Sequence, residues 1–380
     1  MKKGFTLVEL LAVIVILAII LVIAVPQINN VIKQTKMNSL GSTAKIIAAK
    51  AEEATVENEI LESNEALTCA NLVKLDDNYG SCTVSVTNGV GTVTIAGANK
   101  FAGITCTGTK SNMNCATVQI AADTIIAKYN NGTNNEGLIL VNNNEYRYSG
   151  SSVKNYVNFN NETWRIVGIF NGRIKLMRDA MLGTNVYWDL TDPYSNTWEG
   201  SEIEVGLNGN YLTNTGYLGS SLSDEAQNLI DNVDWYVTPI TDDQNTESAY
   251  SAERPSTGAI TYEGKVGLIY PSDYGYASSG CYNNNEIKLN RYNNSQCIST
   301  NWMYANMSRG MWIISPYSGG TYYALTVNFS NDSNNGVMGY SGVNIPGKGV
   351  RPSVYLKPGV KLTSTSGDGS SANNAYVFEV

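Results

Sequence analysis

The chain has 380 residues, a net charge of −8, a charged fraction of only 15% and no histidine. The missing imidazole excludes Ser–His–Asp triads, histidine metal sites and histidine proton shuttles. The negative charge argues against a basic nucleic-acid surface, and the length predicts two domains beyond an N-terminal helix.

The first 25 residues hold the strongest signal in the chain. Two lysines and Gly4 precede an apolar run from Phe5 to Val25, about 21 residues, which is long enough as a helix to cross a bilayer. A secretory signal is cut after its apolar core, whereas a cut between Gly4 and Phe5 would leave this core on the mature chain. Glu9 is the one acid within the run, and a carboxylate in hydrocarbon needs a partner, so we treat it as a functional candidate.

This segment, GFTLVELLAVIVILAIILVIAVP, resembles the class III signal of type IV prepilins and pseudopilins. The cleavage glycine, the aromatic residue after it, the fifth-position glutamate and the proline Pro26 all match that pattern. The resemblance implies that a prepilin peptidase cuts after Gly4 and methylates the amino terminus of Phe5. It also implies that Glu9 guides assembly by pairing with the terminal amine of a neighbouring subunit. The expected partners are therefore prepilin peptidase, other pilin subunits and the cell membrane.

Helical periodicity continues beyond Pro26, and we predict a leader of residues 1–4 followed by one helix over 5–59. Proline lacks a backbone donor and crowds the preceding turn, so Pro26 should kink or loosen this helix. A stripe of apolar residues at helical spacing is expected to pack on a head domain: Ala44, Ile47, Ala48, Ala51 and Val56.

Residues 60–120 predict a small pilin-like head. Strand patterns over 82–86 and 92–95 flank an Asn-Gly turn, and two shorter strands follow over 103–106 and 115–120. A long helix with a roughly four-stranded antiparallel sheet is the architecture that the resemblance to pilins implies.

The six cysteines occur as an even set without C-x-x-C spacing, which favours disulfides in an exported protein over zinc or redox sites. Sequence alone leaves the connectivity open. Order along the chain favours pairs that staple short loops: Cys69–Cys82, Cys106–Cys115 and Cys281–Cys297.

We predict a linker over residues 121–150, because it contains the Asn- and Gly-rich stretch 130–137, and then one large β-rich α+β domain over 151–380. The hairpin signal is clearest at Asn171-Gly172, which separates two strand patterns. The whole chain is thus expected to be an α+β protein.

The order of motifs in this second part resembles a domain of bacterial surface proteins and is similar to C-type-lectin-like folds, including the formylglycine-generating type. The motifs are Trp164–Val167, Trp198 with Leu207-Asn208, Trp312 with Ser315-Pro316, and Val350–Leu356. The paired redox cysteines of the formylglycine enzymes and the sugar motifs Glu-Pro-Asn and Gln-Pro-Asp are not evident, so neither activity is carried over.

Other residues in this domain are weaker candidates. Trp188 and Trp198 are first core anchors and second a ligand surface. Three loop acids (Asp179, Asp189 and Asp192) are calcium candidates without a complete motif, so we predict no metal site and no cofactor. Arg351 is expected to be a buried residue that binds carbonyl groups.

We expect a type IV pilin-like filament subunit that is not an enzyme, anchored in the cell membrane before assembly and exposed at the cell surface afterwards. Its second domain is expected to be adhesive, with a glycan or a protein as the surface ligand. Three alternatives remain at this point: a pseudopilin of a secretion or DNA-uptake system, a membrane-tethered surface enzyme, and a plain anchored surface protein that no prepilin peptidase processes.

Overall fold

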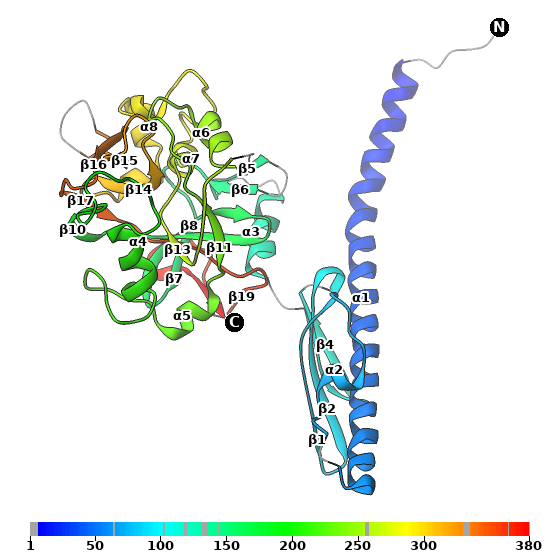
Figure 1. Cartoon of the computed structure of the whole chain (residues 1–380). Coiled ribbons are helices and arrows are strands. Elements are labelled where there is room, and N and C mark those ends of the chain that lie inside the picture. Colours follow the sequence, from blue (N-terminus) through cyan, green and yellow to red (C-terminus); the bar gives the residue numbers. More distant parts are fainter. Residues whose placement is uncertain are drawn as a thin grey trace. The chain divides into compact units, whose positions relative to one another are not determined.

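The computed structural model describes residues 7–63, 65–101, 103–117, 120–130, 136–142, 145–254, 258–329, 335–363 and 365–379; over 7–30 and at residue 130 it describes the backbone alone. The chain divides into two compact units, residues 1–119 (unit 1) and 120–380 (unit 2). Helices and strands occur in both units (Figure 1), which confirms the α+β class.

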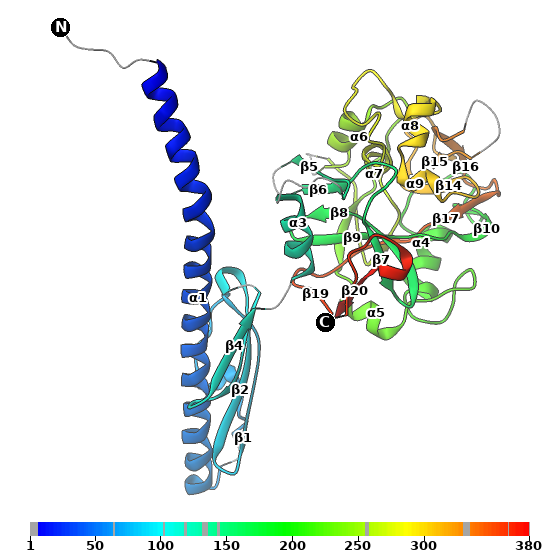
Figure 2. The ribbon, with the colours of Figure 1, turned by 180° about the vertical axis from the view of Figure 1, so that it is seen from behind.

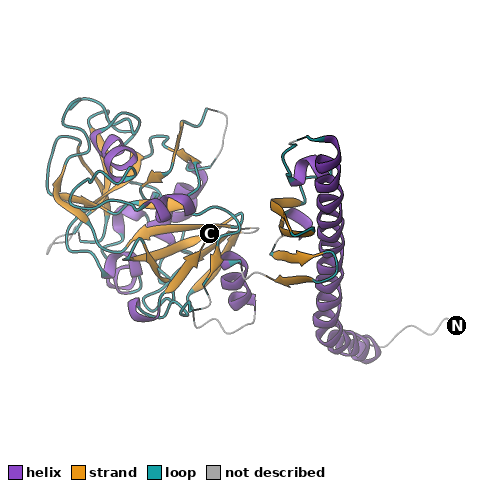
Figure 3. Cartoon of the chain, turned by 90° about the horizontal axis from the view of Figure 1, so that it is seen from below, coloured by secondary structure: helices purple, strands orange, loops and turns teal. Residues whose placement is uncertain are grey.

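Unit 1 combines a 55-residue helix with a small sheet. Helix α1 spans Leu7–Leu61 and continues through Pro26, where the sequence predicted a kink or loosening. The strands described in this unit form one antiparallel sheet in chain order, with a short helix and a 3-10 turn beside it: β1 (Tyr79–Thr87), β2 (Val90–Gly97), β3 (Ile104–Thr109), β4 (Met113–Thr117), α2 (Cys69–Leu72) and η1 (Asn99–Phe101). This is the helix-and-sheet arrangement expected of the head, and Figure 3 shows the sheet along one side of α1.

The buried face of α1 carries small and apolar side chains. Leu40, Ala44, Ile47 and Ala48 lose all solvent exposure in one cluster with residues of β2 and β3. Burial of a leucine or isoleucine side chain contributes roughly 1.5–3 kcal/mol, and the alanines let the helix and sheet backbones approach closely. A Cβ added to Gly91 of β2 would lie only 2.3 Å from the Ala48 carbonyl oxygen. Larger side chains at this contact would separate the helix from the sheet.

Within the described residues, unit 2 contains sheets of nine, five and two strands. The strand order of the nine-stranded sheet is β13-β18-β9-β8-β7-β20-β19. In addition, β6 pairs with β8, and β5 pairs with β6. The nine strands are β5 (Leu138–Asn142), β6 (Glu145–Tyr148), β7 (Tyr156–Phe159), β8 (Glu162–Phe170), β9 (Arg173–Arg178), β13 (Val266–Gly267), β18 (Ser353–Tyr355), β19 (Lys361–Leu362) and β20 (Tyr376–Glu379). Figure 2 shows the C-terminal strand β20 beside β7, to which it pairs in parallel.

The five-stranded sheet runs β10-β17-β14-β15-β16, so that β16 is an edge strand. Its strands are β10 (Leu182–Val186), β14 (Met311–Pro316), β15 (Tyr323–Val327), β16 (Met338–Gly342) and β17 (Lys348–Val350). The small third sheet pairs β11 (Val233–Tyr236) with β12 (Thr261–Gly264) in antiparallel fashion.

Short helices connect these strands, and the side chains of serine and asparagine begin many of them. Each such N-cap accepts a backbone hydrogen bond from the first turn, as at Ser201, Ser223, Asn245, Asn294 and Asn301. The helical segments of unit 2 are α3 (Ala121–Asn130), α4 (Glu202–Gly206), the π-helical η2 (Leu207–Tyr211), α5 (Asp224–Leu229), α6 (Thr246–Ala252), α7 (Pro271–Tyr276), η3 (Leu289–Arg291), α8 (Ser295–Ser299), α9 (Trp302–Ala305) and η4 (Ala372–Asn374).

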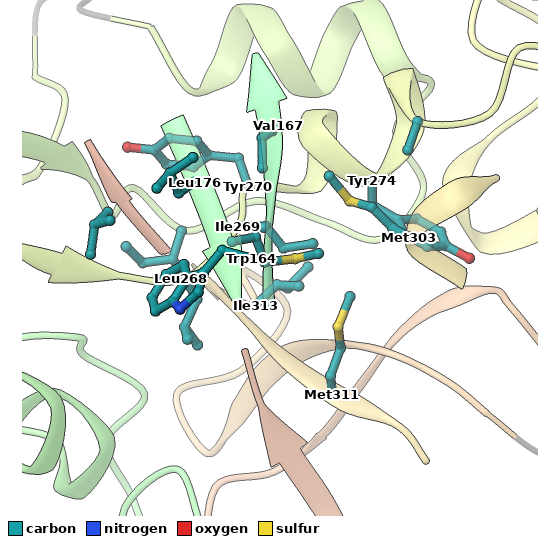
Figure 4. Packing of buried hydrophobic residues seen from close by; sticks show 14 of the residues in the cluster. Trp164, Val167, Leu176, Leu268, Ile269, Tyr270, Tyr274, Met303, Met311 and Ile313 are labelled. Atoms are coloured by element: carbon teal, nitrogen blue, oxygen red, sulfur yellow. The ribbon is translucent and has the colours of Figure 1, made fainter. Parts of the chain in front are cut away.

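Unit 2 has its own aromatic and aliphatic core. The six tryptophans of the chain all lie in this unit and are at most 2% exposed. Figure 4 shows Trp164 and Leu176, from β8 and β9, packed with Leu268, Ile269 and Ile313. The hairpin predicted at Asn171-Gly172 joins β8 to β9, and the positive φ angles of both residues, 51° and 80°, are those that a tight two-residue hairpin requires.

The segment expected to be a linker, residues 121–150, is instead part of unit 2. Helix α3 buries Ala121, Ala122 and Ile125 in the core, and β5 and β6 extend the nine-stranded sheet through pairing with β8. Beyond the N-terminal part of α1, no helix in the described part of the chain is long and apolar enough to cross a membrane.

Candidate functional site

The N-terminal processing residues predicted from the sequence, Gly4 and Phe5, lie outside the described residues. Glu9 and Pro26 lie within α1, where the backbone alone is described. The predicted roles of these four residues in processing and assembly therefore rest on the sequence pattern.

Four large apolar side chains are exposed on a second side of α1 from residue 31 onward, among polar ones. An α-helix turns about 100° per residue, so Val31, Ile46, Val56 and Ile60 project on the side opposite the buried Ala44. Their exposed fractions are 65%, 52%, 53% and 73%. We call these four residues the outer face of α1. Val56 was expected to pack on the head, but it belongs to this exposed face instead, because its angular position is opposite the sheet.

Polar contacts and a disulfide fix the head against the inner face of α1. Glu52 accepts a hydrogen bond from the Gly91 amide at 3.0 Å and pairs with Lys110. The hydrogen bond from Lys110, followed by that from Gly91, lowers the pKa of this carboxyl group. The Cys106–Cys115 disulfide bridges β3 and β4 beside Gly41 of the helix, and a Cβ at Gly41 would lie 2.8 Å from the Cys115 sulfur.

The described residues contain three disulfides, and they are the neighbouring pairs that chain order favoured: Cys69–Cys82, Cys106–Cys115 and Cys281–Cys297. Each closes a short loop, with sequence separations of 13, 9 and 16 residues. Two of them lie in unit 1 and the third in unit 2. Each bridge therefore restrains only a short segment of the chain. In unit 2 this segment is the loop between Cys281 and Cys297.

Trp188 and Trp198 are core residues, which confirms the first interpretation, and the second one, a ligand surface, is wrong. The two side chains are 0% and 1% exposed and meet edge to face at 5.6 Å, and Trp188 also contacts Trp312 at 5.8 Å. The indole nitrogen of Trp188 donates to the Thr197 carbonyl oxygen at 3.3 Å. These tryptophans are core residues because the loop that carries them folds back over the five-stranded sheet.

Exposed aromatic side chains gather instead near the edge strand of that sheet. Five rings form a continuous series: Tyr194 meets Tyr322 at 6.5 Å, Tyr322 meets Tyr323 at 5.3 Å, Tyr323 meets Tyr340 at 5.1 Å, and Tyr340 stacks on Tyr317 at 4.2 Å. Tyr194, Tyr322 and Tyr340 are 74%, 49% and 47% exposed. We call these five residues the tyrosine platform. Sequence reasoning missed it, although adjacent tyrosines after a Gly-Gly turn are a visible signal.

One buried amide holds the platform in place. The side-chain nitrogen of Asn196 lies 3.0, 3.1 and 2.7 Å from the carbonyl oxygens of Tyr317, Gly320 and Tyr323. The Val343 amide donates to the Tyr322 carbonyl oxygen at 3.0 Å, so the loop after β16 is tied to the same turn. Hydrogen bonds within the protein therefore hold the backbone beneath the rings.

The loop aspartates considered as calcium ligands instead accept hydrogen bonds from donor groups of the protein. Asp189 accepts hydrogen bonds from the amides of Thr191 and Asp192, at 2.9 and 3.1 Å, and from the Thr191 hydroxyl. Asp179 accepts from the Asn306 side chain at 3.0 Å. No cluster of three metal-ligating side chains occurs within the described ranges. Arg351 is buried, as predicted, and donates to the carbonyl oxygens of Met303 and Asn306 at 2.9 and 2.7 Å.

Four ionisable side chains meet inside unit 2. Asp273 of α7 accepts hydrogen bonds from Arg147 of β6 at 2.5 Å and from Lys175 of β9 at 2.6 Å. Although burial alone would raise the pKa of Asp273, the two cations hold it below its ordinary value. Burial, and then the charge of Asp273, raises the pKa of Glu253 to about 8.

The same four residues are closed to solvent. The side chains of Lys175 and Asp273 have no exposed area, and Glu253 accepts from the Ser272 amide at 2.9 Å and also bonds the Ser272 hydroxyl. Rings of Trp235, Tyr270 and Tyr355 surround the Lys175 ammonium group. Buried charges with perturbed pKa values also occur in structural networks, and this placement suits stability rather than chemistry on a substrate from solution.

Comparison with known proteins bears on the N-terminus. Residues 1–25 match the sequence model of the prokaryotic N-terminal methylation motif. No curated protein and no solved structure matches the chain. The matched segment contains Gly4, Phe5 and Glu9, the residues that the sequence pattern singled out.

The chain therefore carries a class III signal of the prepilin type, and this motif supports a precursor of the type IV pilin or pseudopilin kind. The motif implies processing by prepilin peptidase and assembly with other pilins, with a membrane-anchored stage before assembly at the surface.

Proposed function

We propose that this prepilin-type precursor becomes a filament subunit that assembles through α1 and displays unit 2 as an adhesive accessory domain. The peptidase substrate residues are Gly4 and Phe5, and Glu9 guides docking. The observation that carries the proposal is the methylation motif at residues 1–25, which leads directly into a 55-residue helix with a pilin-like sheet packed on one face.

The two faces of α1 support the assembly role. The inner face is committed to the head, because Leu40, Ala44 and Ile47 have no solvent exposure. The outer face keeps large apolar side chains in water, which is unfavourable for an isolated subunit. Contact with the helices of neighbouring subunits would bury these side chains and gain roughly 25 cal/mol for each Å² of apolar surface removed from water.

Unit 2 supports the display role. It has a core of its own and begins at Ile120, directly after the head. Its exposed tyrosine platform offers a contact surface, whereas its buried ion cluster has no access for a substrate. The exposed platform and the closed ion cluster together favour an adhesive domain over the alternative of a membrane-tethered enzyme.

Processing is tested with the full chain expressed together with a prepilin peptidase. We expect the mature mass to lack residues 1–4 and to carry one methyl group, located on Phe5 by sequencing the N-terminal peptide. A Gly4→Val variant is the matched control and should keep its leader. An uncleaved chain, in cells that process a control prepilin, would reject the filament role and leave a tethered surface protein.

Assembly is tested separately from processing. Glu9→Ala and Ile46→Glu should both be processed but should reduce the amount of sheared surface filament, because the first removes the docking charge and the second places a charge in the outer face. Lys45→Gln, one position from Ile46 and also exposed, should assemble normally. Processed subunits that form only short periplasmic or wall-embedded assemblies would identify the pseudopilin alternative.

A further inference from the structure

We propose that the tyrosine platform of unit 2 is a binding surface for an uncharged polysaccharide; this inference deepens the adhesive role proposed above and rests on it. The platform collects five tyrosines from three segments of the chain, and three of the rings are about half exposed or more. Exposed aromatic clusters of this kind are uncommon on soluble domains and often mark binding sites.

The rings of the platform are not coplanar and offer an extended ligand several separate contacts. Tyr317 and Tyr340 stack at an interplanar angle of 15°, and the other contacts turn successive rings against each other. The Ser318-Gly319-Gly320 turn lies close beneath: a Cβ on Gly319 would be 2.4 Å from the Tyr317 ring. The Tyr317 ring therefore lies directly against this turn, and a side chain at position 319 would force the ring to move.

Rigidity lowers the cost of binding at this surface. Asn196 is only 7% exposed and binds three carbonyl groups beneath the platform. Tyr323 and Tyr340 also belong to the β15–β16 ladder, in which Tyr323 pairs with Gly342 and Tyr340 with Leu325. Tyrosine itself supplies a large contact area for little lost rotamer freedom, so a ligand meets a surface that is already ordered.

The local charge excludes one broad class of ligands. The segments that build the platform and its border, residues 187–201, 317–323 and 338–347, contain no lysine or arginine and three acids, Asp189, Asp192 and Glu199. Asp192 accepts the Tyr194 amide at 3.2 Å, and burial followed by the charge of Asp242 raises the pKa of Tyr317. The two acids that adjoin the platform residues, Asp192 and Asp242, repel polyanions such as phosphate-rich polymers, sulfated glycans and nucleic acids.

What remains is a neutral ligand with both apolar and polar faces. The C–H faces of pyranose rings can stack on tyrosine, while sugar hydroxyls can bond the phenol groups and the exposed Ser318. A polysaccharide repeats these groups along its length, so several rings of the platform can be used at once. A peptide added to the edge strand β16 is the competing occupant, but it would use the backbone edge of the sheet and not the exposed rings of Tyr194 and Tyr322.

The binding test uses the full-length mature chain in detergent micelles and isothermal titration calorimetry. The probes are cellohexaose and chitohexaose as uncharged oligosaccharides and polygalacturonate as an anionic one. We expect at least one uncharged probe to bind and polygalacturonate not to bind. A Tyr194→Ala/Tyr322→Ala variant should lose about tenfold in affinity for each ring removed. Phe329→Ala, an aromatic residue that is 38% exposed outside the platform, should bind normally.

Absence of binding to both uncharged probes, equal binding by the double variant, or preferential binding of polygalacturonate would overturn the inference. A cell-adhesion assay distinguishes failure of the polysaccharide inference from failure of the proposed adhesive function. If cells without the chain adhere as well as wild type, the adhesive function is wrong. If adhesion needs the chain but the Tyr194→Ala/Tyr322→Ala cells adhere normally, the function stands and the platform is not its binding surface.

Discussion

The Glu253→Gln substitution should make the stability of unit 2 less sensitive to a rise in pH between 4.5 and about 8. Burial raises the pKa of Glu253 from 4.5 to about 8, so the folded state holds a proton that the unfolded state releases within this window. Unfolding is therefore favoured as the pH rises, and the stabilisation is lost progressively until the folded pKa is reached. One such proton changes the free energy of unfolding by about 1.4 kcal/mol per pH unit, or about 5 kcal/mol over the window.

The substitution is nearly isosteric and removes the titration. The glutamine oxygen can accept from the Ser272 amide, and its NH2 group can donate to the Ser272 hydroxyl, so both contacts of Glu253 can be kept. We expect the variant to match wild type near pH 4.5 and to be more stable by up to about 5 kcal/mol near pH 8. Glu247→Gln, on the exposed side of helix α6, which ends immediately before Glu253, is the matched control and should follow wild type.

Urea unfolding followed by tryptophan fluorescence measures this effect in the full chain, with the disulfides intact. The signal reports unit 2 alone, because all six tryptophans lie there. The urea midpoints of the two proteins should be compared from pH 5 to pH 8. Where the denaturant dependence of the unfolding free energy (the m-value) is unchanged, a change in midpoint is a change in stability. Parallel pH profiles of wild type and Glu253→Gln would refute the assignment of a buried, neutral Glu253.

Three further changes test the packing. Gly41→Ala should destabilise the head by about 1–3 kcal/mol, because the added methyl group meets the Cys115 sulfur; faster hydrogen exchange in β4 would show this, and Ser42→Ala is the neighbouring control. Trp188→Ala should cost about 3–5 kcal/mol in urea unfolding of unit 2, and a neutral result would mean that Trp188 is not in the core. Replacing the Cys281–Cys297 bridge with two serines should cost about 3 kcal/mol, and an unchanged urea midpoint would contradict that stabilising role.

The sequence predicted unit 1 well because its signals are local. The apolar run, the spacing of Ala44, Ile47 and Ala48, and the Asn88-Gly89 turn all lie within a few residues of the structure that they specify. Val56 was misplaced for a related reason: it has helical spacing, but its angular position is opposite the sheet. The hairpin at Asn171-Gly172 in unit 2 was equally clear, because both turn residues take the positive φ that the pattern requires.

Features that depend on distant contacts were not predictable. Helix α3 is short and adjoins the Asn-rich stretch that suggested a linker, and β5 and β6 become strands only through pairing with β8. Composition favoured burial of Trp188 but left a ligand surface as the second interpretation, because both positions suit a tryptophan in a polar loop. The partners of Asp273 lie 98 and 126 residues away in the chain, so no spacing rule could find the ion cluster.

The start and the end of unit 2 are fastened to each other. Ile120 forms a β-bridge with Lys361, and the Ala121 amide donates to the Val360 carbonyl oxygen at 2.9 Å. Domains whose ends lie close together are tolerated as insertions and fusions in other proteins. Unit 2 is therefore a self-contained structural module: recombination could transfer it to another carrier protein with its core intact, so that the two units of the chain can evolve separately.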